Sequence, residues 1–147
     1  VGKLRESERG YYERLKEIIQ KENLEDTLEI RKNLSFKDLK HELKTSKLYV
    51  HTAVDDTMPS TPIEAMAAGN SILVHRSGGP WIDVAEEGEH GEGWTDADEL
   101  SEKLQEFVQS GDLKPEKNIE RAKNFSEEKF NQEVEKLLNQ IEEKQDG

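Results

Sequence analysis

The 147-residue sequence contains no cysteine, which excludes disulfide bonds and thiolate metal sites. Basic residues are few beside acidic ones: 21 lysines and arginines stand against 33 aspartates and glutamates, and the net charge is −12. Nucleic acids and anionic membrane surfaces attract clustered positive charge, so we expect neither as a partner. The sequence shows no signal peptide and no apolar run of about 18 residues, so we expect no membrane span and a cytoplasmic location.

Apolar residues are also scarce, at 32% of the chain, whereas charged residues make up 37%. A chain of this length supports one core, so we expect residues 1–147 to form a single domain with strongly amphipathic helices. The first part alternates between helical and strand patterns: helix Tyr11–Lys21, strand Leu28–Ile30, helix Ser35–Ser46 and strand Leu48–Val50. This alternation is typical of an α/β fold with a doubly wound parallel sheet and helices on both faces.

The second part of the chain is expected to be mostly helical. Asp96 is predicted to cap a helix through Val108, with Leu100, Leu104, Phe107 and Val108 on its core side. Residues 112–147 are expected to form C-terminal helices of the same domain, one from Pro115 to Lys123 and another after Phe125. Five apolar residues of the last helix are spaced for one buried face: Phe130, Val134, Leu137, Leu138 and Ile141. This helix has three possible fates: packing on the sheet, binding a partner, or fraying.

Residues with chemical potential gather between Leu48 and Gly79. The polar loop from Asp55 to Ser60 follows the Leu48–Val50 strand, so it should lie at the surface, at the carboxyl end of that strand. Thr61, Pro62 and Glu64 then match an N-cap, a first helical position and the acid of a capping box. Gly69 is predicted to end this helix before a strand over Ser71–Val74.

Two anion-binding elements are predicted at this edge. In an open parallel sheet, ligands bind outside the carboxyl ends of the strands, where helix amino termini favour diphosphates. The helix near Thr61 is one such element, and the turn Ser77–Pro80 is another because Gly78 and Gly79 let a ligand approach the backbone. Spacing alone also allows ordinary structural explanations, namely a capping box worth about 1 kcal/mol and a tight strand-to-helix turn.

The whole stretch resembles the donor-binding segment of the group 1 retaining glycosyltransferases with the GT-B fold. The family signature is two acids eight positions apart before a small-residue helix, matched here by Asp56, Glu64 and Ala65–Gly69, and Val74–Gly79 matches the next family turn. The resemblance covers nearly the whole chain and implies a Rossmann-like, C-terminal half of a GT-B fold. It also implies a truncation, because the acceptor domain and the first, basic units of the donor domain are missing.

The resemblance assigns roles to individual residues. Glu64 would hold the ribose hydroxyls of a nucleoside diphosphate sugar, and Asp56 would lie near the transferred sugar as the candidate catalytic residue. The nucleotide sugar is the substrate, and the resemblance implies no metal and no cofactor. The remaining candidate donor-binding residues would contact the sugar and diphosphate through backbone amides, or in the case of Arg76 through a positive charge. They are Thr57, Ser60, Thr61, Gly78, Gly79 and Arg76.

The loop departs from the family pattern at two points. Asp56 stands where the family has glutamate, and Pro59 stands where it has glycine, although proline has no amide hydrogen and cannot adopt a positive φ. Two functions are therefore open. The chain is either a donor-side glycosyltransferase domain, inactive without an acceptor domain, partner chain or second copy, or a non-catalytic interaction domain with the same fold.

The four histidines give no metal-binding pattern: His41, His51, His75 and His90 are too scattered in the sequence. His51 and His75 both end predicted strands beside the loop. They could meet there as an acid, base or ligand pair, or serve only as polar caps of the strands.

Overall fold

The computed structural model describes residues 1–111 and 115–145. It divides into two compact units, Val1–Glu42 and Leu43–Gly147. Of the segment predicted to form the C-terminal helices, residues 112–114 and 146–147 lie outside the described part. Within the described part, no helix is long and apolar enough to cross a membrane.

The first unit contains the 3-10 turn Glu6–Glu8, helix α1 (Arg9–Lys21) and the start of α2 (Phe36–Thr45). The α2 start confirms the predicted cap, because Ser35 Oγ accepts a hydrogen bond from Asp38 N at 3.2 Å. The strand predicted over Leu28–Ile30 is wrong. Strand structure needs a continuous partner, and the described residues of this unit provide only one isolated parallel bridge, Gly2 to Lys32.

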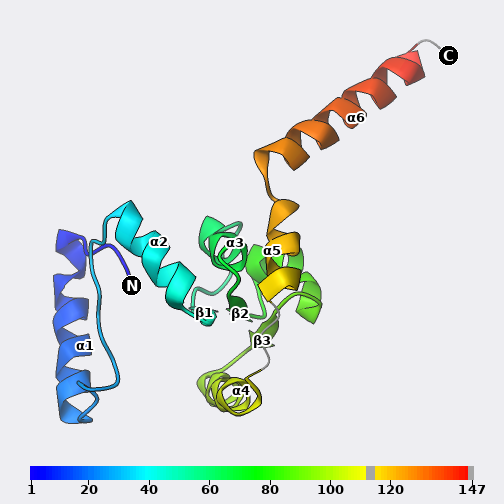
Figure 1. The fold of residues 1–147 in the computed structure, drawn as a ribbon. Helices are drawn as coiled ribbons and strands as arrows, with labels where there is room; N and C mark the ends of the chain where they lie inside the picture. The colour runs from blue at the N-terminus through cyan, green and yellow to red at the C-terminus, as the bar shows by residue number, and fades with distance from the viewer. Residues whose placement is uncertain (112–114, 146–147) are drawn as a thin grey trace. The chain divides into compact units, whose positions relative to one another are not determined.

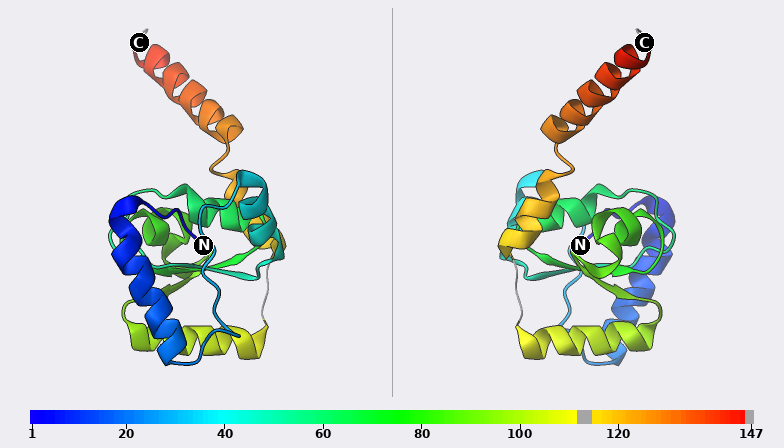
Figure 2. Two further views of the ribbon diagram at one scale, coloured as in Figure 1. Left: turned by 90° about the vertical axis from the view of Figure 1, so that its left-hand side faces the viewer. Right: turned by 90° about the vertical axis from the view of Figure 1, so that its right-hand side faces the viewer.

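The second unit is built on a three-stranded parallel sheet in the order β1, β2, β3. The strands are β1 (Leu48–His51), β2 (Ser71–His75) and β3 (Glu92–Trp94). Helix α3 (Ser60–Ala67) connects β1 to β2, and the short helices η2 (Pro80–Val84) and η3 (Glu86–Gly88) connect β2 to β3. Figures 1 and 2 show α3 and α5 on one face of this sheet and α4 on the other, which confirms the predicted Rossmann-like α/β fold.

The core of the second unit surrounds the central strand β2 and helix α3. Ile72, Leu73 and Val74 form the continuous apolar run expected of a central parallel strand, and each is at most 2% exposed. Burying each such side chain contributes about 1.5–3 kcal/mol. The other buried apolar side chains come from neighbouring elements: Ala65, Met66, Val84, Ala85, Trp94 and Ala122.

Helix α4 (Ala97–Ser110) begins as predicted, because the Asp96 side chain accepts a hydrogen bond from Glu99 N at 2.9 Å. The prediction that Val108 faces the core is wrong, since 81% of this residue is exposed. Leu100, Leu104 and Phe107 are half-buried along one stripe. A sheet of three strands covers only a narrow stripe of a helix, and Val108 lies beyond its edge.

Two helices follow, α5 (Pro115–Lys123) and α6 (Glu127–Gln145). Helix α5 packs against α3 and buries Asn118, Arg121 and Ala122. The predicted buried face of α6 is wrong, because Phe130 is 67% exposed and Leu137 is 56% exposed. The described helices α3, α5 and α4 already cover the two faces of the small sheet, so α6 has no sheet surface to cover.

Candidate functional site

The polar loop after β1 and the glycine turn after β2 lie against each other at the carboxyl edge of the sheet. The two strands are parallel neighbours, so their carboxyl ends open on the same edge. Asp55 N donates a hydrogen bond to Ser77 Oγ at 2.8 Å, and Gly79 N donates one to Asp56 O at 2.9 Å. The sequence prediction that these two segments share one edge is therefore confirmed.

The contact between loop and turn requires both glycines. A Cβ atom on Gly78 would lie 2.1 Å from Asp56 O, and one on Gly79 would lie 1.7 Å from Thr57 O. Gly78 also has a φ of +63°, which side-chain-bearing residues rarely adopt. The glycines thus have a structural purpose, and the Gly79 amide already has a partner inside the protein. Their contact with a diphosphate stays a prediction.

Helix α3 begins two residues earlier than expected, at Ser60 instead of Pro62. Its N-cap is Pro59, with φ −71° and ψ 135°, so the prediction that Thr61 is the N-cap is wrong. Proline fixes this extended conformation by itself and has no side-chain acceptor for a cap. The first-turn amides of a helix lack intrahelical partners, and Ser60 and Thr61 occupy that turn while Pro62 has no amide hydrogen. Ser60 and Thr61 therefore remain the predicted donors of α3 to an anion.

The two acids of the family signature both influence the pKa of Tyr49, which lies in β1. Burial raises the pKa of the Tyr49 phenol, and the nearby charges of Glu64 and Asp56 raise it further, while a hydrogen bond with Thr61 opposes the rise. Asp56 is half-buried and Glu64 is exposed. Three predicted site residues thus influence the pKa of one phenol at the edge of the sheet.

His51 supplies a buried ring beside Asp56. It is 8% exposed, and its Nε2 lies 3.3 Å from Asp56 Oδ2. That approach lacks hydrogen-bond geometry, so Nε2 is a buried polar atom without a hydrogen-bond partner. On the other side of the ring, Nδ1 lies 3.3 Å from Tyr49 Oη.

The possible pair of His51 and His75 is not formed, because the two rings have different partners. His75 Nδ1 lies 2.7 Å from Ser77 Oγ, and its Nε2 lies 3.3 Å from the Thr95 carbonyl oxygen. Its ring also meets Trp94 edge-on at 4.8 Å between centroids. His75 therefore supports the end of β2 and the glycine turn.

Arg76 is engaged by α4. Its Nη2 lies 2.7 Å from Glu99 Oε1, and its guanidinium lies 5.8 Å from the Trp81 ring. Hydrogen bonds from Thr95, and secondarily the bond and charge of Arg76, lower the pKa of Glu99. The positive charge of Arg76 is thus met within the protein, and its contact with a diphosphate stays a prediction.

Arg121 of α5 has a structural role that the sequence pattern did not indicate. It is 9% exposed, donates from Nε to the Val84 carbonyl at 3.2 Å and from Nη2 to the Asp83 carbonyl, and pairs with Glu86 Oε1 at 2.7 Å. It thereby closes the end of η2 and holds the loop that leads to β3. An arginine in a charged helix carries no local signal of such a role.

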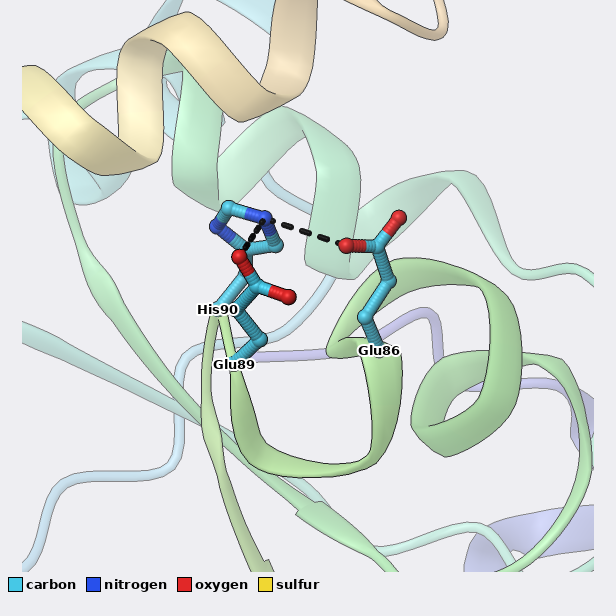
Figure 3. Close-up of side chains that lie close together, drawn as sticks. All are labelled: Glu86, Glu89 and His90. Atoms are coloured by element: carbon cyan, nitrogen blue, oxygen red, sulfur yellow. Dashed lines mark ion pairs between the residues drawn. The ribbon is translucent and has the colours of Figure 1, made fainter.

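Figure 3 shows the group of side chains in the described residues that could hold a metal ion: Glu86, Glu89 and His90. Their ligand atoms lie within 4.8 Å of one another, with His90 Nε2 at 3.2 Å from Glu86 Oε2 and 3.8 Å from Glu89 Oε1. Arg121 already provides a positive charge to the other oxygen of Glu86. An ion-pair cluster between the loop and α5 accounts for this arrangement.

Comparison with known proteins assigns the chain to a family. The model of the family described as "Glycosyl transferases group 1" matches residues 1–129. The GDP-Man:Man(3)GlcNAc(2)-PP-Dol alpha-1,2-mannosyltransferase of Mus musculus is 33% identical over 70 residues, which are 48% of this chain and 14% of the relative. The Homo sapiens protein of the same name is 34% identical over 61 residues, 42% of this chain and 12% of the relative.

The Xenopus laevis protein of that name is 37% identical over 57 residues, 39% of this chain and 12% of the relative. The matched stretches thus span less than a sixth of the length of these relatives. No solved structure matches. The family match covers both the loop and the glycine turn, so the chain belongs to the group 1 glycosyltransferases.

Proposed function

We propose that this chain is the donor-side part of a sugar-transferring enzyme and that the carboxyl edge of its sheet binds a nucleoside diphosphate sugar. The observation that carries the proposal is the packing of the Asp56 loop against the turn formed by Gly78 and Gly79, at the edge where α3 begins with Ser60 and Thr61. These are the residues that the family signature assigns to the donor. Family membership supports the sugar-transfer role, and the gathering of the residues supports a single site.

The chemistry of the side chains suits the proposed contacts. The exposed Glu64 carboxylate can accept two hydrogen bonds from a vicinal diol such as that of ribose. The first-turn amides of Ser60 and Thr61 can donate to phosphate oxygens with the help of the α3 dipole. Asp56 is proposed to face the transferred sugar. Catalysis in this arrangement consists mainly of positioning and leaving-group stabilisation.

A bound diphosphate needs positive charge nearby, and the described residues at this edge offer none that is unpaired. The chain carries a net charge of −12, and Arg76 is already paired with Glu99. We therefore propose that transfer requires another domain or chain that brings basic residues to this edge, as well as the acceptor. The relatives are named as enzymes that use GDP-Man, so GDP-mannose is the first donor to test.

The test is a titration of the chain with GDP and GDP-mannose, followed by amide NMR. We expect saturable shifts at Thr61, Glu64 and Gly79, and loss of binding in Glu64→Gln. Glu102→Gln is the matched control, because Glu102 is an exposed residue of α4. No shift at millimolar ligand, or equal effects of the two substitutions, would reject donor binding by this chain.

A non-catalytic interaction domain is the second candidate. It is supported by the exposed apolar residues of α6, where Phe130 is 67% and Leu138 is 54% exposed, and by Pro59 in the loop. Exposed apolar surface of this kind is typical of an interaction site. The titration separates the two candidates, because an interaction domain would leave both nucleotides unbound.

A further inference from the structure

We propose that Tyr49 and His51 are positioning residues for the carboxylate of Asp56: the Tyr49 phenol donates to His51 Nδ1, which directs the proton of His51 Nε2 at Asp56. This inference rests on the proposed function for its role in donor binding. Its structural part concerns only the free chain. No pattern in the sequence indicated that these two β1 residues act on Asp56.

The strand geometry places the two rings together. Residues two apart on a strand share one face, and Tyr49 and His51 stack with ring centroids 6.2 Å apart at an angle of 28°. Tyr49 Oη lies 3.3 Å from His51 Nδ1, and His51 Nε2 lies 3.3 Å from Asp56 Oδ2. The imidazole ring thus lies between the phenol and the carboxylate, with its Nδ1 hydrogen-bonded to the phenol and its Nε2 facing the carboxylate.

Burial leaves His51 Nε2 with the Asp56 carboxylate as the acceptor that it faces. His51 is 8% exposed, and its Nε2 is buried without a hydrogen-bond partner. A buried polar atom without a partner costs free energy, and the Asp56 carboxylate is the acceptor that it faces. Catalytic hydrogen bonds are often long in unliganded proteins and tighten in the complex. A small movement of the loop would turn this 3.3 Å approach into a charge-assisted hydrogen bond.

The direction of the hydrogen bonds follows from Tyr49. A tyrosine phenol with an ordinary pKa of about 10 carries its proton at neutral pH. Burial raises the pKa of the Tyr49 phenol further, and the Thr61 hydroxyl hydrogen-bonds to it. With Thr61 donating to Tyr49 Oη, the phenol proton is directed to His51 Nδ1. Neutral His51 must then carry its own proton on Nε2, which faces Asp56. Thr61 thus donates to Tyr49 and Tyr49 to His51, and the proton on Nε2 is the one that a small movement of the loop would bring to Asp56.

The first test reads the free chain. Two-bond ¹⁵N–¹H NMR of the histidine rings should show His51 as the Nε2–H tautomer. Tyr49→Phe removes Oη but keeps the ring, and it should shift the Nδ1 resonance. The matched control Tyr11→Phe, at a residue 60% exposed in the first unit, should leave it unchanged. The inference would be overturned if His51 is the Nδ1–H tautomer, or if its Nδ1 resonance does not change in Tyr49→Phe.

The second test separates positioning from folding. Asp56 is proposed to face the sugar, so Tyr49→Phe and His51→Leu should weaken GDP-mannose binding by about tenfold while GDP binding stays unchanged. His51→Gln, which can place an amide N–H near the position of Nε2, should restore most of the loss. Equal losses for both ligands would indicate a merely structural role and refute the inference. If the unsubstituted chain binds neither ligand, the proposed function fails, and the tautomer still decides whether the hydrogen-bond chain exists.

Discussion

Alanine at Gly79 tests the packing of the loop on the turn. Gly79 has φ −61° and ψ −35°, which alanine adopts freely, so the substitution adds no backbone strain. The new Cβ would lie 1.7 Å from Thr57 O, and that carbonyl must retreat by about 1.3 Å to reach 3.0 Å, below which Cβ contacts are essentially never found. The retreat breaks the bond from Gly79 N to Asp56 O. Overpacking of about 1–3 kcal/mol and a lost hydrogen bond of about 1 kcal/mol predict a total cost of about 2–4 kcal/mol.

Gly111→Ala is the matched comparison. Gly111 has a φ of +59° and no atom within 4 Å of an added Cβ, so alanine there costs only about 1 kcal/mol of backbone strain. Urea unfolding followed by tryptophan fluorescence measures both, because Trp81 and Trp94 both lie in the second unit. The reasoning is refuted if Gly79→Ala costs no more than Gly111→Ala, or if the amide resonances of Asp56 and Thr57 do not move.

Three further predictions concern the second unit. The raised pKa of Tyr49 means that the folded state favours the protonated phenol. The stability from this group is therefore complete below the ordinary pKa of 10.0 and declines as pH rises through the pKa of the folded state. Urea unfolding midpoints should fall less between about pH 9 and 11 in Tyr49→Phe than in the unsubstituted chain. Arg121→Met keeps the buried stem but loses the carbonyl bonds and the pair with Glu86, which is 41% exposed, so thermal unfolding should show a loss of about 3 kcal/mol. Asn70→Asp would direct a carboxylate at the Leu43 and Ala65 carbonyls in a fully buried site; we expect a loss of at least ~3 kcal/mol at neutral pH, partly recovered in acid.

The fold was predictable where local signals agreed. Short apolar runs marked β1 and β2, a glycine with φ +89° followed α3 at Gly69, and Asp96 capped α4 as its sequence indicates. The Leu28–Ile30 strand was wrong because strand formation depends on a distant partner that a local pattern does not reveal. The exposed face of α6 was missed for the same reason, since helical spacing shows that a helix has an apolar face without showing what covers it.

The two acids of the candidate site were predictable from the sequence, but the residues that support them were not. Asp56 and Glu64 carry a signature that survives in the sequence as a fixed spacing. Tyr49 and Arg121 act through contacts made only after folding, the first with His51 and the second with backbone carbonyls of Asp83 and Val84. A tyrosine in a strand and an arginine in a charged helix match so many ordinary positions that spacing alone does not distinguish them.

The glycine turn also bears on how this edge can change during evolution. The atoms that Gly78 and Gly79 approach are the backbone carbonyls of Asp56 and Thr57, and the hydrogen bond that joins loop and turn is likewise between backbone atoms. Substitution of the Thr57 or Met58 side chain therefore leaves this contact intact. Side chains of the loop can therefore change during evolution while the backbone contact that holds the loop on the turn stays the same, so new surface chemistry at this edge costs little in folding.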